Sequence, residues 1–226
     1  MTVLFIILTF AIIITTQIVM KKLRERNLRE VAAPSMENIN LGFNVEDFVV
    51  PAGLFFYKGH TWANVTESGE IKVGLSDFGQ KLFTNIDRLE LHQSGEDIGQ
   101  GDHAFVVKQG DKEVEFHAPI SGKISSINKK LLENPSLLKK SPYEDGWIYK
   151  MKPQSLSKEI RRLRVAEDAR KWIIAEVQRL KEFLMGEYSE GRLLQNTMAD
   201  GGIPVDGIIN FLNDSSIKRM QSQFLR

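Results

Sequence analysis

The 226-residue chain contains no cysteine. Disulfide bonds, thiolate metal sites, iron–sulfur clusters and thiol nucleophiles are therefore excluded. The chain also has little net charge, because 30 Lys and Arg residues face 29 Asp and Glu residues. Without an excess of positive charge it lacks the long-range field that attracts nucleic acid, so no nucleic-acid partner is expected.

Catalytic and metal-binding motifs are missing too. There is no Gly-x-Ser-x-Gly, and Gly201-Gly202 is not followed by Lys-Ser or Lys-Thr at the spacing of a phosphate loop. No His-x-x-x-His or His-x-x-Glu unit is present, and the histidines are scattered over different predicted strands and turns: His60, His92, His103 and His117. We therefore predict no catalytic residues, no metal site and no enzyme.

The N-terminus has the one long uncharged stretch of the chain. Residues 2–20, TVLFIILTFAIIITTQIVM, can cross a hydrocarbon core of about 30 Å as a helix. A cleaved signal peptide would need a basic start and a small-x-small cleavage site, and both are missing. A buried core helix is the other alternative, but such helices are usually shorter and amphipathic. A transmembrane helix is predicted.

Basic residues follow this stretch directly, as KKLRER at 21–26 and then Arg29. The positive-inside rule places such residues in the cytoplasm, so a single-pass protein with its N-terminus outside and its C-terminal domain cytoplasmic is expected. The lipid bilayer is then a partner through residues 2–20. The predicted domains are an anchor at 1–22, a juxtamembrane linker at 23–50 that leads to a short strand near 48–50, a β-domain at 51–153 and a helical extension at 154–226.

Short strand signals fill the region from Leu54 to Met151, and the central one is 105–122, FVVKQGDKEVEFHAPISG. Gly110-Asp111 between two β-rich runs predicts a two-residue hairpin turn. With Gln109 opposite Lys112, the pairs Val107 with Val114 and Phe105 with Phe116 fall on one buried face, and Lys108 faces Glu113 on the other. Asp111 is then at the exposed tip.

The motifs of this region, taken in order, are specific enough to compare with a family. It resembles the H protein of the glycine cleavage system, a lipoyl carrier of the biotinyl/lipoyl (single hybrid motif, hammerhead) fold. The resemblance covers about residues 53–153 and implies a mainly β, flattened antiparallel sandwich. The matching residues are Tyr57, His60 and Trp62; Val73 to Gln80; Gly95; Gly101-Asp102; Ala118 to Gly122; Asn128 and Leu131; Asn134-Pro135; Ser141 to Tyr143; and Gly146-Trp147.

The resemblance fails at the residue that would carry the cofactor. In the family the lipoyl lysine lies eight residues before the proline of the Ser-Pro-x-Ser-Gly motif, and counting back from Pro119 gives Asp111. A carboxylate cannot form the lipoyl amide that a lysine amine forms. Lys112 is the alternative acceptor, although a shift of one residue turns a strand side chain to the opposite face. No cofactor is expected, with lipoate on Lys112 as the alternative.

After Pro153 the apolar residues recur at spacings of three and four from Leu156 to Leu184, which predicts one long amphipathic helix over about 155–188. Its apolar stripe must be buried against the sandwich, a second copy or another protein, and Trp172 disfavours an extended coiled coil. Two short helices are predicted near 205–212 and 215–224, after the loop signal at 200–204.

Two functions from different classes follow. The first is a membrane-anchored docking module that has lost lipoyl carriage and binds an unknown protein partner through its C-terminal helices. The second is a lipoylated carrier of the glycine cleavage type that uses Lys112. A membrane-fusion adaptor also joins a span to lipoyl-like domains, but here the long helix follows the sandwich and the expected orientation is cytoplasmic.

Overall fold

The computed structural model describes residues 17, 41–42, 44–193, 203–204 and 206–226. Contacts divide the chain into two units, 1–39 and 40–226. The predicted span at 2–20 therefore lies outside the described residues apart from Gln17. Within the part of the chain that the structure describes, no helix is both long and apolar enough to cross a membrane.

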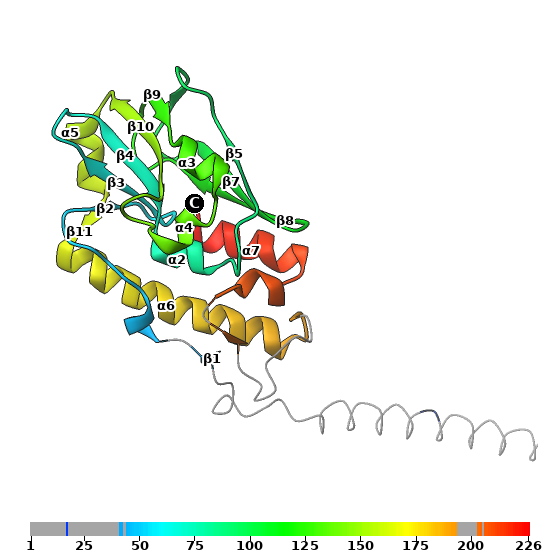
Figure 1. Cartoon of the computed structure of the whole chain (residues 1–226). Helices are drawn as coiled ribbons and strands as arrows, with labels where there is room; N and C mark the ends of the chain where they lie inside the picture. Colours follow the sequence, from blue (N-terminus) through cyan, green and yellow to red (C-terminus); the bar gives the residue numbers. More distant parts are fainter. Residues whose placement is uncertain (1–16, 18–40, 43, 194–202, 205) are drawn as a thin grey trace, which may run out of the picture. The chain divides into compact units, whose positions relative to one another are not determined.

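A seven-stranded antiparallel sheet forms one layer of the second unit (Figure 1). Alternation of apolar residues explains its central hairpin, in which Ile71, Val73 and Leu75 all point into the core. Its strands, in spatial order, are β11 (Arg164–Val165), β2 (Phe55–Phe56), β3 (Thr61–Val65), β4 (Ile71–Leu75), β10 (Trp147–Pro153), β9 (Gly122–Ile127) and β6 (Asp97–Ile98).

A three-stranded antiparallel sheet forms the second layer, in the order β5 (Arg88–Leu91), β7 (His103–Gln109) and β8 (Lys112–His117). The predicted hairpin register is confirmed: Gln109 pairs with Lys112, Lys108 with Glu113, Val107 with Val114 and Phe105 with Phe116. The two apolar pairs are fully buried. The two antiparallel sheets agree with the predicted sandwich, and β8 is at one edge.

Short helices connect the strands, and two of them begin where the sequence provides a side-chain cap. In α2 (Asp77–Lys81) the Ser76 hydroxyl accepts from Gly79 N, and in α3 (Lys129–Glu133) the Asn128 side chain accepts from Lys130 N. A third helix, α4 (Leu137–Lys140), follows Asn134-Pro135. A two-stranded parallel pair, β1 (Leu41–Gly42) with β12 (Ile203–Pro204), lies apart from the main sheets.

The strand predicted near 48–50 is wrong. A 3-10 turn, η2 (Val45–Asp47), comes first, and the chain then runs on without strand pairing. Side chains satisfy the backbone instead: Val49 N donates to Asp77 Oδ2 at 2.9 Å, and the Tyr143 hydroxyl donates to Val49 O at 2.7 Å. These contacts hold the segment against α2, where Phe48 is buried.

The single long helix predicted over 155–188 is also wrong, because its first third is divided. α5 (Leu156–Glu159) and η3 (Ile160–Arg162) are followed by β11, whose two residues pair with Phe55 and Phe56. The chain turns at Ala166, which has a φ of 51°, and α6 (Ala166–Ser189) begins there. Apolar residues keep helical spacing here because α5 and η3 are themselves helical turns, from which Leu156, Ile160 and then Leu163 pack against the core.

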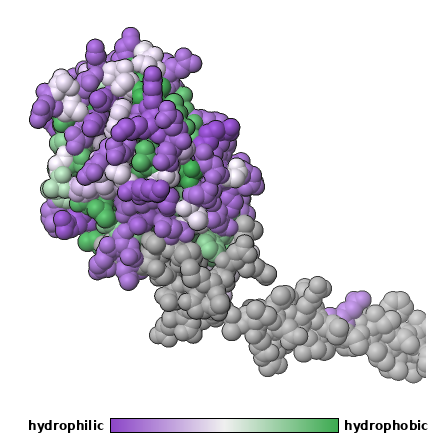
Figure 2. All heavy atoms as spheres, in the orientation of Figure 1, coloured by the Kyte–Doolittle hydropathy of each residue, from purple (hydrophilic) through white to green (hydrophobic). Residues whose placement is uncertain are grey.

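The apolar stripe of α6 packs on the protein itself. Ile173, Val177, Leu180 and Leu184 are buried in the main core together with residues of both sheets. η4 (Ile208–Phe211) and α7 (Asp214–Phe224) complete this layer, and Figure 1 shows α7 between α6 and the β7–β8 hairpin. The face seen in Figure 2 is mostly hydrophilic. The extension at 154–226 therefore buries its own stripe, and its protein partner stays a prediction.

Candidate functional site

The tip of the β7–β8 hairpin holds Asp111 and Lys112, the two residues that the sequence indicates for cofactor attachment or its loss. Gly110 has a φ of 59° and Asp111 does not have a positive φ, which matches the type II′ turn that glycine favours in its first position. Asp111 is exposed at the apex. Behind it, Gly110 N donates to Asp87 Oδ2 at 2.7 Å, and the carbonyl oxygen of the Gln109 side chain accepts from Thr84 N at 2.9 Å. The tip is thus fixed from the side of residues 84–87.

The C-terminal extension holds the tip from the other side. Asn210 in η4 accepts a 2.7 Å hydrogen bond from the Gln109 amide and donates to the Thr84 hydroxyl at 2.9 Å. Gly207, with a φ of 85°, lets η4 approach the loop so closely that a Cβ at this position would overlap Thr84 Oγ1. Sequence reasoning missed this contact, since nothing in the pattern of 205–212 says which surface it covers.

Lys112 points to the inner side of the hairpin. Its ammonium group donates to the backbone oxygens of Ile209 at 2.5 Å and Leu212 at 3.1 Å. Burial lowers the pKa of Lys112, and the carboxylates of Asp111 and Asp214 act in the opposite direction. The Lys112 amine therefore serves as a donor that fastens η4 to the hairpin, and it does not project from the apex.

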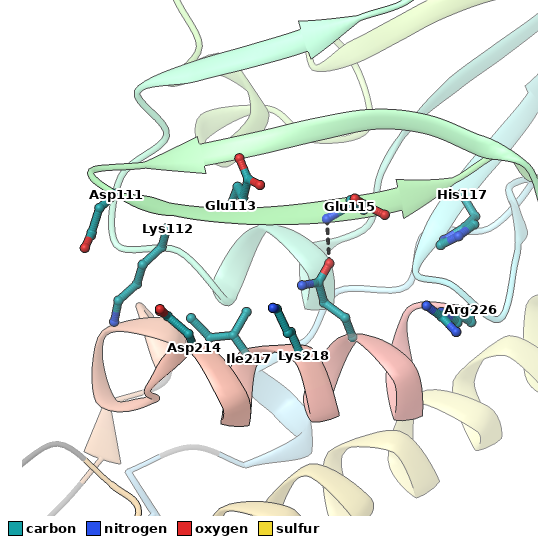
Figure 3. A pocket seen from close by; sticks show the side chains of 10 residues that line it. Asp111, Lys112, Glu113, Glu115, His117, Asp214, Ile217, Lys218 and Arg226 are labelled. Atoms are coloured by element: carbon teal, nitrogen blue, oxygen red, sulfur yellow. Dashed lines mark hydrogen bonds between the residues drawn. The ribbon is translucent and has the colours of Figure 1, made fainter.

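A groove of about 490 Å³ runs beside the hairpin between β8 and α7 (Figure 3). The acidic residues Asp111, Glu113 and Asp214 lie toward the tip of the hairpin. Lys218 lies on the α7 wall, and Arg226 lies at the far end of the groove. Glu115 N donates to the side-chain oxygen of Gln221 across this groove at 2.8 Å. The lining residues are Asp111, Lys112, Glu113, Glu115, His117, Asp214, Ile217, Lys218, Gln221 and Arg226.

The histidines are not all scattered as the sequence suggested. The rings of His92 and His103 lie edge to face with centroids 5.5 Å apart, and His92 Nδ1 is 2.7 Å from Glu96 Oε2. His117 Nδ1 donates to Leu225 O at 2.7 Å. Among the described residues, no group of three or more His, Cys, Asp or Glu side chains is placed to hold a metal ion.

Ser121, in the Pro-x-Ser-Gly turn, has a structural role. Its hydroxyl donates to Glu159 Oε1 at 2.5 Å and its backbone N to Glu159 Oε2 at 2.7 Å. Glu159 is buried and comes from α5, so this carboxylate ties the extension to the turn. Sequence reasoning treated Ser121 as a turn residue but had no signal for its partner.

Comparison with known proteins decides the family. The sequence profile described as Glycine cleavage H-protein matches residues 54–176, which is 123 of 226 residues. The chain belongs to this family. Its members are lipoyl carriers rather than catalysts, which agrees with the non-enzymatic prediction.

Two curated relatives give the same result. The chain is 34% identical over 129 residues to "Probable glycine cleavage system H protein" of Thermococcus gammatolerans, a match covering 57% of this chain and 96% of the relative. It is 35% identical over 106 residues to "Glycine cleavage system H protein 2" of Pseudomonas putida, covering 47% and 83%. A solved glycine cleavage system H protein from Mycobacterium marinum aligns with 23% identity and a TM-score of 0.44, covering 46% of this chain and 87% of that one.

Lipoate is the cofactor that the family implies, and the residues at the tip do not fit it. An acceptor needs a lysine amine that a modifying enzyme can reach, whereas the apex carries Asp111 and the amine of Lys112 is bonded to two backbone oxygens. Lys108, on the outer face, is engaged by Glu90 at 2.7 Å and Glu113 at 3.1 Å.

Proposed function

We propose that this chain is a glycine cleavage H-type domain that does not carry lipoate and acts as a docking module. The observation that carries the proposal is the pairing of the Lys112 ammonium with the oxygens of Ile209 and Leu212 beside an apex occupied by Asp111. A hydrogen bond from a charged donor is worth about 1.5–3 kcal/mol, so exposing Lys112 to a modifying enzyme would cost a substantial part of the stability of this corner.

The extension supports the same proposal. The family match ends at residue 176, and the later segments η4 and α7 lie outside it. They cover the inner side of the hairpin with polar contacts at Gln109, Lys112 and Glu115. A carrier needs its arm-bearing tip free to visit other proteins, whereas here the residues on either side of the exposed apex are bonded to a helical layer.

The proposed module is tethered to a bilayer by residues 2–20 and faces the cytoplasm, as the uncharged stretch and the basic residues at 21–26 indicate. Protease protection of sealed membrane vesicles tests this part. Cleavage of the domain from the cytoplasmic side only is expected, and protection there with cleavage from the opposite side would contradict it.

Intact mass of the protein purified from its native host tests the loss of carriage. The expected result is the unmodified mass, with the peptide containing Asp111 and Lys112 also unmodified. A lipoyl adduct on a substantial fraction of molecules would end the proposal.

The second candidate, a carrier that uses Lys112, is favoured only by family membership. If it holds, the parent protein reacts with an antibody against lipoate and Lys112→Arg abolishes the signal. Absence of signal from the parent protein excludes this candidate.

A further inference from the structure

Within the described part of the chain, the outer edge of β8 has no strand paired to it. In a two-residue hairpin the closing pair, Gln109 with Lys112, is hydrogen-bonded, and the pattern alternates along the strands. Glu113 and Glu115 therefore turn their backbone N–H and C=O groups away from β7, toward the sheet edge. The bond from Glu115 N to Gln221 confirms this direction. An edge of this kind is a template on which another strand can pair.

This edge faces the groove between β8 and α7 (Figure 3). Its volume of about 490 Å³ is within the range of pockets that bind ligands, about 300–1,000 Å³. A strand edge on one wall and a helix on the other is the arrangement in which an extended peptide adds to a sheet while its side chains contact the helix.

The charges of the groove are separated along its length. Asp111, Glu113 and Asp214 lie toward the tip, whereas Lys218 and Arg226 lie farther along (Figure 3). Glu113 is already paired with Lys108 at 3.1 Å, and the single charge of Lys112 offsets only one of the two remaining tip carboxylates, Asp111 and Asp214. An extended segment with a basic residue near the tip and an acidic residue near Lys218 would complement both ends.

Gln221 occupies the position of a strand partner. Its side-chain oxygen accepts from Glu115 N, as the backbone carbonyl of a neighbouring strand would. The side chain is half-buried at the groove wall, and a change of rotamer would move it away from Glu115 N. An incoming strand would replace the bond from Glu115 N to Gln221 with one to its own backbone carbonyl. It would also pair with the outward backbone N–H and C=O of Glu113.

We infer that the β8–α7 groove is a docking site for an extended protein segment, which pairs antiparallel with β8 and places a Lys or Arg beside Asp111 and Asp214. The inference deepens the proposed docking function and rests on it. Antiparallel pairing follows the rest of this sheet, so the segment runs from an acidic residue near Lys218 to a basic residue near the tip.

NMR titration of the isotope-labelled full-length protein with the peptide acetyl-Glu-Val-Thr-Val-Lys-amide tests the inference. Saturable shifts at the amides of 113–115 and 217–221 are expected. The same peptide with Glu in place of Lys, and a version N-methylated at Thr, are expected to bind at least fivefold more weakly. Equal binding of the three peptides, or no shifts at these amides, would overturn the inference.

Variants separate docking from stability. Gln221→Ala removes the competing acceptor, so peptide affinity should rise about fivefold, as the loss of roughly 1 kcal/mol of competing hydrogen bond predicts. Asp111→Asn should weaken binding because it removes a tip carboxylate, and Glu113→Pro should abolish binding because the proline lacks the outward N–H. Glu67→Gln, in the distant exposed turn between β3 and β4, is the matched control and should bind as the parent does.

The outcomes distinguish this inference from the proposed function. An unmodified mass together with absent peptide binding overturns only the groove, whereas a lipoyl adduct overturns the docking function whatever the titration shows. If the peptide instead shifts every resonance of 206–226, it displaces the extension, and the groove as inferred is wrong.

Discussion

The imidazole of His60 and the ring of Phe78 stack face to face, with centroids 3.8 Å apart and planes 11° from parallel. The stack continues on both sides. Trp172 of α6 lies 4.7 Å from the other face of His60, and Phe224 of α7 lies 6.3 Å from Phe78. Aromatic pairs contribute about 0.5–1.5 kcal/mol beyond their buried area. The His-x-Trp motif of the family thereby joins the sandwich to the extension.

An arginine guanidinium lies over the outer ring at each end of this aromatic stack. The guanidinium of Arg164 lies 4.9 Å from the Trp172 ring centroid, and that of Arg179 lies 4.9 Å from the Phe224 ring centroid. Such contacts add about 0.5–1 kcal/mol each at partly exposed sites. Trp172 therefore has two roles on α6: it stacks on His60, and it packs against the hydrophobic core.

Because of His60, the protein is expected to become less stable as the pH is lowered. The side chain is fully buried, and burial lowers the pKa of its imidazole while Glu176, 3.5 Å away, acts in the opposite direction. The unfolded histidine takes up a proton below about pH 6.5. The unfolded state therefore binds more protons, and the contribution of His60 is complete above pH 6.5 and declines as the pH falls below it.

His60→Asn tests this, since asparagine accepts the φ of 60° found here but cannot stack. The free energy of unfolding of the variant should be about 2–3 kcal/mol below that of the parent at pH 7, and this difference should be smaller at pH 5. Urea unfolding at both pH values measures it. His103→Asn, at an exposed position, is the control and should change little. An equal loss at both pH values would show that burial does not affect His60 titration.

How much the sequence predicts depends on whether contacts are local. The hairpin register followed from alternation and a Gly-Asp turn, both of which involve neighbouring residues. The helix caps at Ser76 and Asn213 are local in the same way, since each side chain accepts from a backbone N–H three residues later. The division of the long helix did not, because the pairing of Arg164-Val165 with Phe55-Phe56 is set by residues more than 100 positions away.

The candidate site was predicted in part. The Gly110-Asp111 turn signal predicted Asp111 at the hairpin tip, and the structure has it exposed there. The partners of Lys112 could not be predicted, because they are backbone oxygens of Ile209 and Leu212, which leave no trace in side-chain pattern. The groove was missed for a similar reason: it exists only once α7 packs beside β8.

Glu187 is expected to stabilise the junction of α6 and α7. Burial raises the pKa of its carboxyl, but hydrogen bonds from Arg192, Arg219 and Ser216 outweigh this and lower it to about 2. The ionised group thus adds on the order of 3 kcal/mol, present above about pH 4.5 and lost as the pH falls toward 2. Glu187→Gln should lose most of this at pH 7 in urea unfolding, with Glu182→Gln on the exposed face of α6 as control. A loss that persists undiminished near pH 2 would contradict the ionic origin.

Lys112→Met is expected to loosen η4. The variant keeps the aliphatic stem but removes the donor to two backbone oxygens. The free energy of unfolding is therefore expected to fall by about 1.5–3 kcal/mol. Amide exchange at 208–212 should become faster than in the parent, while exchange in β3 and β4 should not change. Lys218→Met, whose side chain lines the groove, is the control. Unchanged exchange at 208–212 would mean that Lys112 does not anchor the extension.

Asp111→Lys tests whether the missing amine is what prevents modification. A lysine at the apex of the type II′ turn projects into solvent, whereas Lys112, one residue later, faces η4. Incubation with a lipoate ligase, lipoate and ATP should therefore modify the variant and leave the parent unmodified, as measured by intact mass. The double variant Asp111→Lys with Lys112→Arg assigns the site, and it should be modified to the same extent. Modification of the parent protein at Lys112 would contradict the structural role given to that residue, whereas failure of both variants would show that η4 and α7 also keep the ligase from the tip.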